Sequence, residues 1–240
     1  MQARVRAGLD RLGGLLLPPR CVLCGDRGQR PCLDLCHECE ASLPAASRPS
    51  RDGPWPLATC VAPFDYAPPL DHLVHALKYR GQLAVARVLG TLLGERVAAC
   101  GAATRVDVVL PVPLHPARHA TRGFNQSAEI GRWAAARAGR PLEPRLAARA
   151  RDTPPQVGLD PARRRSNLAT AFIATAAVRG RRVVILDDVT TTGSTLQALA
   201  TALRDAGAVS VDAWCVARAD GRRIDGSDPS GASPVAAGMR

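Results

Sequence analysis

Residues 182–198 constrain the possible folds more than any other part of the chain. The stretch reads RVVILDDVTTTGSTLQA, and residues 183–186 form a continuous apolar run, as in a parallel strand buried on both faces. Two carboxylates, Asp187 and Asp188, follow this run, and a Thr/Gly/Ser loop and an amphipathic segment come after them. This order predicts strand, loop and helix in an α/β fold. Because ligands bind at the carboxyl ends of such strands, we expect this acid pair to face a ligand.

The loop after the acid pair has the composition of a phosphate-binding site. Gly193 permits a positive φ, and the first N–H groups of the following helix lack intrahelical partners, so the helix end favours an anion. The alternative is an ordinary turn whose hydroxyls only cap the helix. Five hydroxyl side chains in six residues favour a phosphate. The candidate residues are Val189, Thr190, Thr191, Thr192, Gly193, Ser194 and Thr195.

The segment DDVTTTGST resembles the phosphoribosyl pyrophosphate (PRPP) motif of type I phosphoribosyltransferases. It is not a Walker loop, which has a lysine before its Ser/Thr. The resemblance implies that Asp187 and Asp188 contact the ribose hydroxyls and that residues 190–195 hold the 5′-phosphate. It also implies a magnesium ion bound with the pyrophosphate and ribose oxygens.

Two CxxC pairs near the N-terminus predict a metal site. Cys21 and Cys24 precede Cys36 and Cys39 by eleven intervening residues. Each CxxC turn directs two sulfurs toward one tetrahedral ion, and four thiolates leave no open position for catalysis. We therefore expect a structural zinc ion. The alternatives for the fourth ligand are Cys32 and His37.

The composition along the chain divides it into five expected segments. No apolar run approaches a membrane span or a signal-peptide core, and the clustered cysteine pairs favour metal over disulfides, so we expect a cytoplasmic protein. The segments are an amphipathic helix at 1–17, a zinc-binding module at 18–46, a linker at 47–56, the main α/β domain at 57–219 and a disordered tail at 220–240.

Further elements are expected within the main domain. Residues 106–110 and 209–217 predict two more buried strands, and Trp214 lies in the core of the second. Trp133 is expected in the core, on the apolar side of a helix that ends at Gly139. Lys78 ends an earlier helix and either faces the phosphate site or is solvated.

Arginines supply candidate groups for binding anions. Arg118 and Arg122 lie in the expected loop 111–122 after the strand at 106–110. Arg164 lies in an arginine trio that either closes over a substrate's phosphates or forms a solvated hairpin. The formal net charge of +11 predicts an anionic partner and does not distinguish phosphorylated metabolites from nucleic acid.

Several segments together resemble the ComF family of phosphoribosyltransferase-like proteins, which is linked to DNA uptake in natural competence. They are the CxxC pairs, LKYRG, VPLHPARHATRGFNQS, RRRSNLATAF and VVILDDVTTTGST, and they extend over residues 21 to about 218. The resemblance implies a type I phosphoribosyltransferase-like fold, a mostly parallel sheet flanked by helices. It also implies that the loop at 111–122 holds pyrophosphate.

Three functional hypotheses follow from these features. In the first, Asp187 and Asp188 hold the ribose of PRPP, and Arg118, Arg122 and Arg164 stabilise pyrophosphate as an acceptor nitrogen displaces it. The sequence reveals no aromatic cluster for an acceptor base. The second is a non-catalytic factor that binds single-stranded DNA and competence proteins, although an aromatic content of 3% argues against stacking on bases. The third is a PRPP-sensing regulator.

Overall fold

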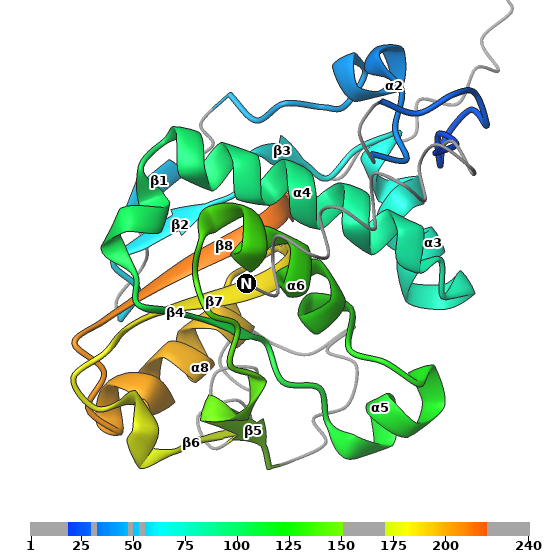
Figure 1. Ribbon diagram of the computed structural model, residues 1–240. Helices are drawn as coiled ribbons and strands as arrows, with labels where there is room; N and C mark the ends of the chain where they lie inside the picture. The colour runs from blue at the N-terminus through cyan, green and yellow to red at the C-terminus, as the bar shows by residue number, and fades with distance from the viewer. Residues whose placement is uncertain (1–18, 30–32, 48–49, 53–55, 151–170, 220–240) are drawn as a thin grey trace, which may run out of the picture.

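A computed structural model describes residues 19–29, 33–47, 50–52, 56–150 and 171–219 of the 240-residue chain (Figure 1). The helix expected at 1–17, Cys32, the arginine trio with Arg164 and the tail expected at 220–240 lie outside these residues.

A mostly parallel sheet forms the centre of the described structure, as predicted. Its strands are β1 (Ser50–Asp52), β2 (Thr59–Val61), β3 (Phe64–Asp65), β4 (Val108–Pro111), β7 (Arg182–Thr190) and β8 (Ser210–Arg218). They are ordered β1-β2-β8-β7-β4, and β3 also pairs with β8. Only β1 runs antiparallel to its neighbour among these pairs. Part of the stretch expected to be a linker, 47–56, thus contributes the edge strand β1.

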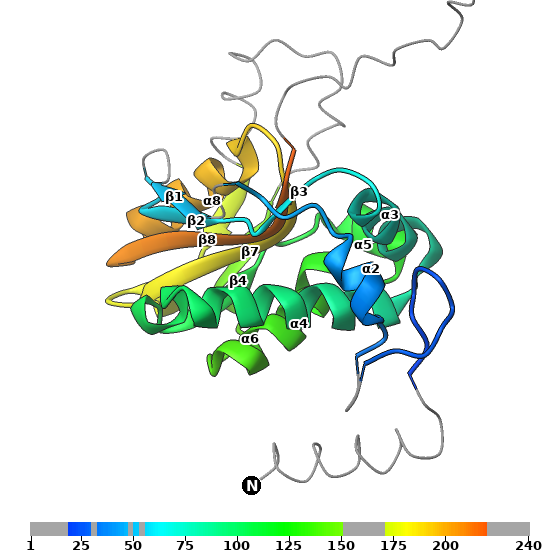
Figure 2. The ribbon, with the colours of Figure 1, turned by 90° about the horizontal axis from the view of Figure 1, so that it is seen from above.

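Helices cover both faces of the sheet (Figure 2). Helices α3 (Leu70–Arg80), α4 (Leu83–Ala99) and α6 (Gln126–Ala138) bury their apolar sides against one face, which includes Val184 and Trp214. Helix α8 (Ser194–Asp205) packs against the other face, which includes Ile185. Trp214 is buried, as the sequence predicted. None of the helices in the described part of the chain is long and apolar enough to cross a membrane.

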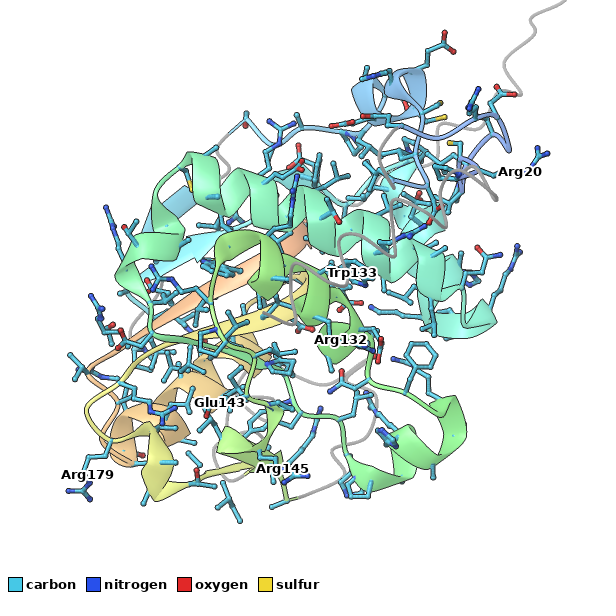
Figure 3. All side chains as sticks on the ribbon, in the orientation of Figure 1. Arg20, Arg132, Trp133, Glu143, Arg145 and Arg179 are labelled. Carbon is cyan, nitrogen blue, oxygen red and sulfur yellow. The ribbon has the colours of Figure 1, made fainter. Side chains whose placement is uncertain are left out.

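Helices α4 and α6 pack closely because glycines face the contact. A Cβ atom at Gly90 would lie 2.3 Å from the carbonyl oxygen of Ile130, so only glycine fits there. The close contact leaves Trp133 at the surface with 37% of its area exposed, while its neighbours Ile130 and Ala134 are buried. The core position expected for Trp133 is therefore wrong. The side chain lies where the two helices meet (Figure 3), and the Arg87 guanidinium is 5.9 Å from its ring.

The loop expected at 111–122 contains a helix. Helix α5 (Pro116–Arg122) starts with a proline, and the Nδ1 atom of His115 accepts a hydrogen bond from Ala117 N at 3.3 Å. It ends at Gly123, whose φ of 79° suits glycine. Two short strands, β5 (Ala147–Arg149) and β6 (Phe172–Ala174), form an antiparallel pair beside the main sheet.

The cysteine-rich segment packs on the helical layer rather than standing apart. It carries a short helix, α2 (His37–Ala41), and its residues Cys21, Leu35 and Leu43 join the core shared with α3 and α4. The buried carboxylate of Asp34 accepts a hydrogen bond from Arg87 Nε on α4 at 3.0 Å. The segment is thereby attached to the helices by apolar packing and by an ion pair.

Candidate functional site

The acid pair lies at the carboxyl end of β7, but within the strand rather than after it. Strand β7 continues to Thr190 because β8 is equally long and offers partners up to Arg218. Asp188 is 3% exposed and Asp187 is half-buried. The two carboxylates are therefore held by the sheet at its ligand-facing edge.

Lys78, whose place the sequence left open, contacts the acid pair. Its ammonium nitrogen lies 2.5 Å from Oδ2 of Asp188, and the side chains are 22% and 5% exposed. Burial alone would lower the pKa of Lys78, but the charge of Asp188 and the hydrogen bond to it outweigh burial and raise that pKa. The lysine therefore stays protonated and compensates the negative charge of Asp188.

Ser127 contacts the other carboxylate. Its Oγ donates a hydrogen bond to Oδ1 of Asp187 at 2.8 Å, and the backbone N–H of Asp188 donates to the same oxygen at 2.9 Å. Asn125 caps helix α6 by accepting from Ser127 N, and its Nδ2 donates to Val112 O at 2.9 Å. The cap fixes Ser127 over the acid pair. Sequence reasoning noted RGFNQS as a motif and did not assign its serine a role.

The environment of Asp187 favours its neutral form. Burial is the largest cause, and the Asp188 carboxylate adds to it, so the pKa of Asp187 rises to about 7. The Ser127 hydroxyl and the Lys78 charge oppose this rise and do not cancel it. Asp187 therefore exchanges its proton close to neutral pH.

The predicted phosphate loop forms the turn between β7 and α8. Thr190 is buried at the end of the strand, whereas Thr191 and Thr192 are exposed. Gly193 adopts a φ of 74°, and α8 begins at the next residue. The Oγ1 of Thr192 lies 3.1 Å from the Oγ of Ser194. The structure thus gathers hydroxyl groups and the start of a helix directly beside the acid pair, which is an arrangement suited to an anion.

The two candidate arginines that the structure describes lie on α5. Arg122 donates to Oε1 of Gln126 at 2.5 Å, and its guanidinium carbon is 5.9 Å from the ring centre of Tyr79. Arg118 is half-buried on the same helix. Tyr79 directly follows Lys78, so Arg122 contacts the same end of α3 that pairs with Asp188.

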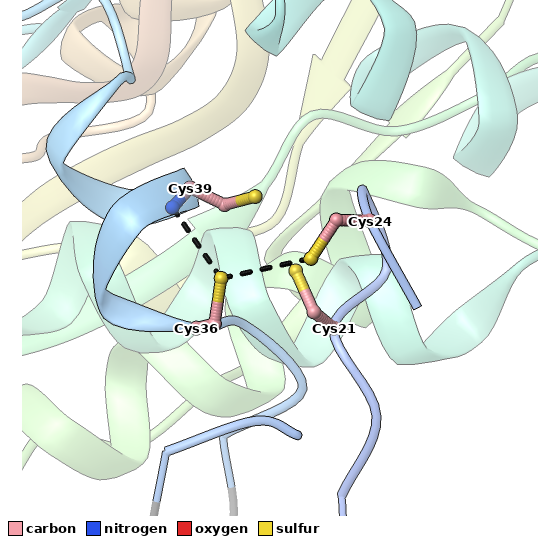
Figure 4. A group of neighbouring side chains, drawn as sticks. All are labelled: Cys21, Cys24, Cys36 and Cys39. Atoms are coloured by element: carbon pink, nitrogen blue, oxygen red, sulfur yellow. Dashed lines mark hydrogen bonds between the residues drawn. The ribbon is translucent and has the colours of Figure 1, made fainter. Parts of the chain in front are cut away.

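The four predicted zinc ligands form a compact cluster (Figure 4). The sulfur atoms of Cys21, Cys24, Cys36 and Cys39 lie within 4.8 Å of one another. Sulfurs about 2.3 Å from a tetrahedral zinc ion are about 3.8 Å apart, and those of Cys24 and Cys36 are separated by 3.7 Å. Burial raises the pKa of the Cys21 thiol, but backbone N–H donors outweigh burial and lower it to about 6. The donor set fits zinc, and His37 lies outside the cluster.

Comparison with known proteins identifies the domain family and the relatives of this chain. Residues 134–231 match the phosphoribosyl transferase domain family. The DNA utilization protein YhgH of Escherichia coli K12 is 35% identical over 210 residues, covering 82% of this chain and 89% of that protein. Competence protein F of Haemophilus influenzae is 33% identical over 164 residues, covering 64% and 70%.

A solved structure of the allosteric regulatory enzyme of purine biosynthesis is also similar. It is 26% identical, with a TM-score of 0.37, and the match covers 55% of this chain and 25% of that one. The family assignment rests on the relatives matched over most of their length. By these matches, the chain belongs to the ComF family of phosphoribosyltransferase-like proteins.

Proposed function

We propose that this protein binds PRPP, or a closely related phosphorylated ribose, at the carboxyl end of β7. The observation that carries the proposal is the acid pair followed directly by an exposed hydroxyl turn at the start of α8. Carboxylates accept hydrogen bonds from a ribose diol, and the turn offers donors for the 5′-phosphate.

Asp187 and Asp188 also provide the oxygen donors that magnesium prefers, so these two residues would hold a magnesium ion that enters with the pyrophosphate. The ion would offset charge on the leaving group. Lys78 holds Asp188 in place, and Ser127 holds Asp187.

The same site suits transfer of the phosphoribosyl group to a nitrogen acceptor. A C–N bond forms at the anomeric carbon while the C–O bond to pyrophosphate breaks, and pyrophosphate leaves with the bonding electrons. The acceptor nitrogen releases its proton to solvent. Arg118 and Arg122 on α5 supply positive charge for the pyrophosphate, and we assign the same role to Arg164.

The names of the relatives support a role in DNA uptake or DNA use, because one is called a DNA utilization protein and another a competence protein. We assign the protein to the cytoplasm, because Cys60, Cys100 and Cys215 are not in disulfide bonds, which suits a reducing compartment.

A second candidate is non-catalytic binding of single-stranded DNA, together with competence proteins, and it is favoured by the net charge of +11. Binding through the phosphate backbone would weaken steeply as salt is raised. This candidate is ruled out if single-stranded oligonucleotides do not bind, or if their affinity is the same at about 50 mM and about 200 mM salt. A PRPP-sensing role would use the same binding residues as the first proposal and would show binding without turnover.

The decisive experiment is calorimetric titration of the zinc-loaded full chain with PRPP and magnesium. We expect binding to the wild type and a loss of about tenfold or more in the Thr191→Ala/Thr192→Ala variant, because exposed donors to the phosphate are removed. Thr201→Ala, on the exposed side of α8, is the matched control and should bind as the wild type does. Absence of heat with the wild type, or equal binding by the double variant, would refute the assignment.

A further inference from the structure

Arg122, the last residue of α5, is held by side chains from two other helices. Its Nη1 atom donates a hydrogen bond to Oε1 of Gln126, the first residue of α6, at 2.5 Å. Its guanidinium carbon lies over the ring of Tyr79, in the last turn of α3, at 5.9 Å from the ring centre. The guanidinium thus has an amide at its edge and an aromatic ring at its face, which together fix the plane of the group.

The last turn of α3 contacts both Arg122 and one member of the acid pair. The ammonium nitrogen of Lys78 is 2.5 Å from Oδ2 of Asp188, and the next residue, Tyr79, contacts the guanidinium of Arg122. The Tyr79 ring also lies against His75, one helical turn earlier, with 4.6 Å between the centroids. His75 therefore supports a ring that is otherwise largely exposed.

The start of α6 contacts Arg122 and the other member of the acid pair. Gln126 accepts from Arg122, and the next residue, Ser127, donates to Oδ1 of Asp187 at 2.8 Å. Gln126 is buried, so its amide has little freedom to leave the guanidinium. Each of the two helices thus carries adjacent residues of which one contacts a carboxylate of the acid pair and the other contacts Arg122. This arrangement ties the position of Arg122 to that of the acid pair.

We propose that Tyr79 and Gln126 are positioning residues, which hold the Arg122 guanidinium ready for the pyrophosphate group of a ligand whose ribose lies at the acid pair. This inference rests on the proposed function, because that function supplies the ligand. Within the described part of the chain, Gln126 takes a donor at one edge and Tyr79 lies at one face, so other N–H groups of Arg122 remain to bind an anion. A guanidinium whose plane is already fixed loses less conformational entropy when it binds a phosphate.

The test is calorimetric titration of the zinc-loaded full chain, in the presence of magnesium, with PRPP, inorganic pyrophosphate and ribose 5-phosphate. We expect Tyr79→Ala to weaken the binding of PRPP and of pyrophosphate about threefold to fivefold, as expected for loss of an exposed cation–π contact. The affinity for ribose 5-phosphate, which lacks the pyrophosphate, should not change. Tyr79→Phe should bind all three ligands as the wild type does, because it keeps the ring.

A double-mutant cycle tests whether Tyr79 acts through Arg122. Arg122→Ala should weaken PRPP binding about tenfold or more, and adding Tyr79→Ala to it should cause no further loss. Gln126→Met removes the amide acceptor and roughly keeps the volume of the side chain, so it should also weaken PRPP binding and spare ribose 5-phosphate. If Tyr79→Ala has the same effect with and without Arg122, the tyrosine does not position the arginine and the inference is overturned.

Trp133→Ala is the matched control. Trp133 is also exposed and lies 5.9 Å from the guanidinium carbon of Arg87, where α4 and α6 meet. The variant should bind all three ligands as the wild type does. The inference is also overturned if Tyr79→Ala binds PRPP as tightly as the wild type does, or if its affinity for ribose 5-phosphate falls to the same extent, since an equal loss indicates a general structural effect.

The two proposals fail in different ways in this experiment. Absence of PRPP binding by the wild type refutes the proposed function. The pyrophosphate titration then decides the inference by itself: the positioning of Arg122 is supported if Tyr79→Ala binds pyrophosphate more weakly than the wild type does, and it is overturned if both bind equally or neither binds. Binding of PRPP by the wild type with no change in Tyr79→Ala refutes the inference alone.

Discussion

The ammonium nitrogen of Lys78 lies 2.5 Å from Oδ2 of Asp188 and joins the last turn of α3 to the carboxyl end of β7. The same helix packs in the core that includes Cys21 and Leu35 of the cysteine-rich segment. The ion pair therefore connects the candidate ligand site to the helical layer on which the metal cluster rests.

Lys78→Met should destabilise the protein by about 2–4 kcal/mol, because it leaves the Asp188 carboxylate buried without its counter-charge. Urea denaturation measures the loss. The double variant Lys78→Met/Asp188→Asn should lose less than Lys78→Met alone, since it removes both charges. A double variant less stable than the single one would show that the pair is not the cause.

The raised pKa of Asp187 predicts a stability that falls with pH. The folded protein holds this proton up to about pH 7, whereas the ordinary value for an aspartate is 3.8, so between these values the folded state binds more protons than the unfolded state. The free energy of unfolding then decreases as pH rises through this window.

Asp187→Asn should remove about 2 kcal/mol of the decrease between about pH 5 and 7, as measured by urea denaturation at each pH. Asp107→Asn is the control, because the hydrogen bonds from Arg182 lower the pKa of Asp107 to about 2, outside the window. Equal pH dependence of the wild type and Asp187→Asn would contradict the prediction.

Ser127→Ala should weaken PRPP binding more at about pH 7 than at about pH 8.5. The Ser127 hydroxyl lowers the pKa of Asp187, so its removal leaves more of the carboxyl protonated, and the neutral carboxyl is a weaker acceptor for the ribose hydroxyls than the carboxylate is. Calorimetry at both pH values measures the effect. A loss of affinity that is the same at both would indicate a steric cause instead.

The cysteine cluster should hold one zinc ion per chain. Cys24→Ser should lose most of this zinc and lower the melting temperature by about 5 °C or more, because the metal stabilises a small segment. Cys24 suits the test since it is exposed, so the change itself disturbs little packing. Elemental analysis and thermal unfolding provide the readouts.

Cys100→Ser, which is exposed and outside the cluster, is the matched control and should keep both zinc and stability. A wild type that contains no zinc after purification without chelators, and that a chelator does not destabilise, would contradict a structural metal.

Features that depend on residues close together in the sequence could be predicted from the sequence. A β-branched run followed by Asp187 and Asp188 predicted a strand in a parallel sheet, and β7 is that strand. Two CxxC pairs predicted a sulfur cluster, and the four sulfurs are together. Such signals are local because the backbone conformation and the spacing of the ligands set them.

Other features depended on how helices pack and could not be found in this way. Trp133 has an apolar ring on a largely apolar helix, and only the close contact at Gly90 leaves it exposed. The stretch 111–122, rich in prolines, was expected to be a loop, and helix α5 forms within it because Pro116 is tolerated at a helix start.

The sequence by itself determined the chemistry available to this protein: an acid pair, a run of hydroxyls and a set of thiols. Only the tertiary structure decided which groups meet that acid pair. Lys78 and Ser127 come from distant segments, and the packing of α3 and α6 on the sheet brings them to one edge. The partner of a carboxylate depends on such long-range packing, and the spacing of residues along the sequence does not indicate which residue it is.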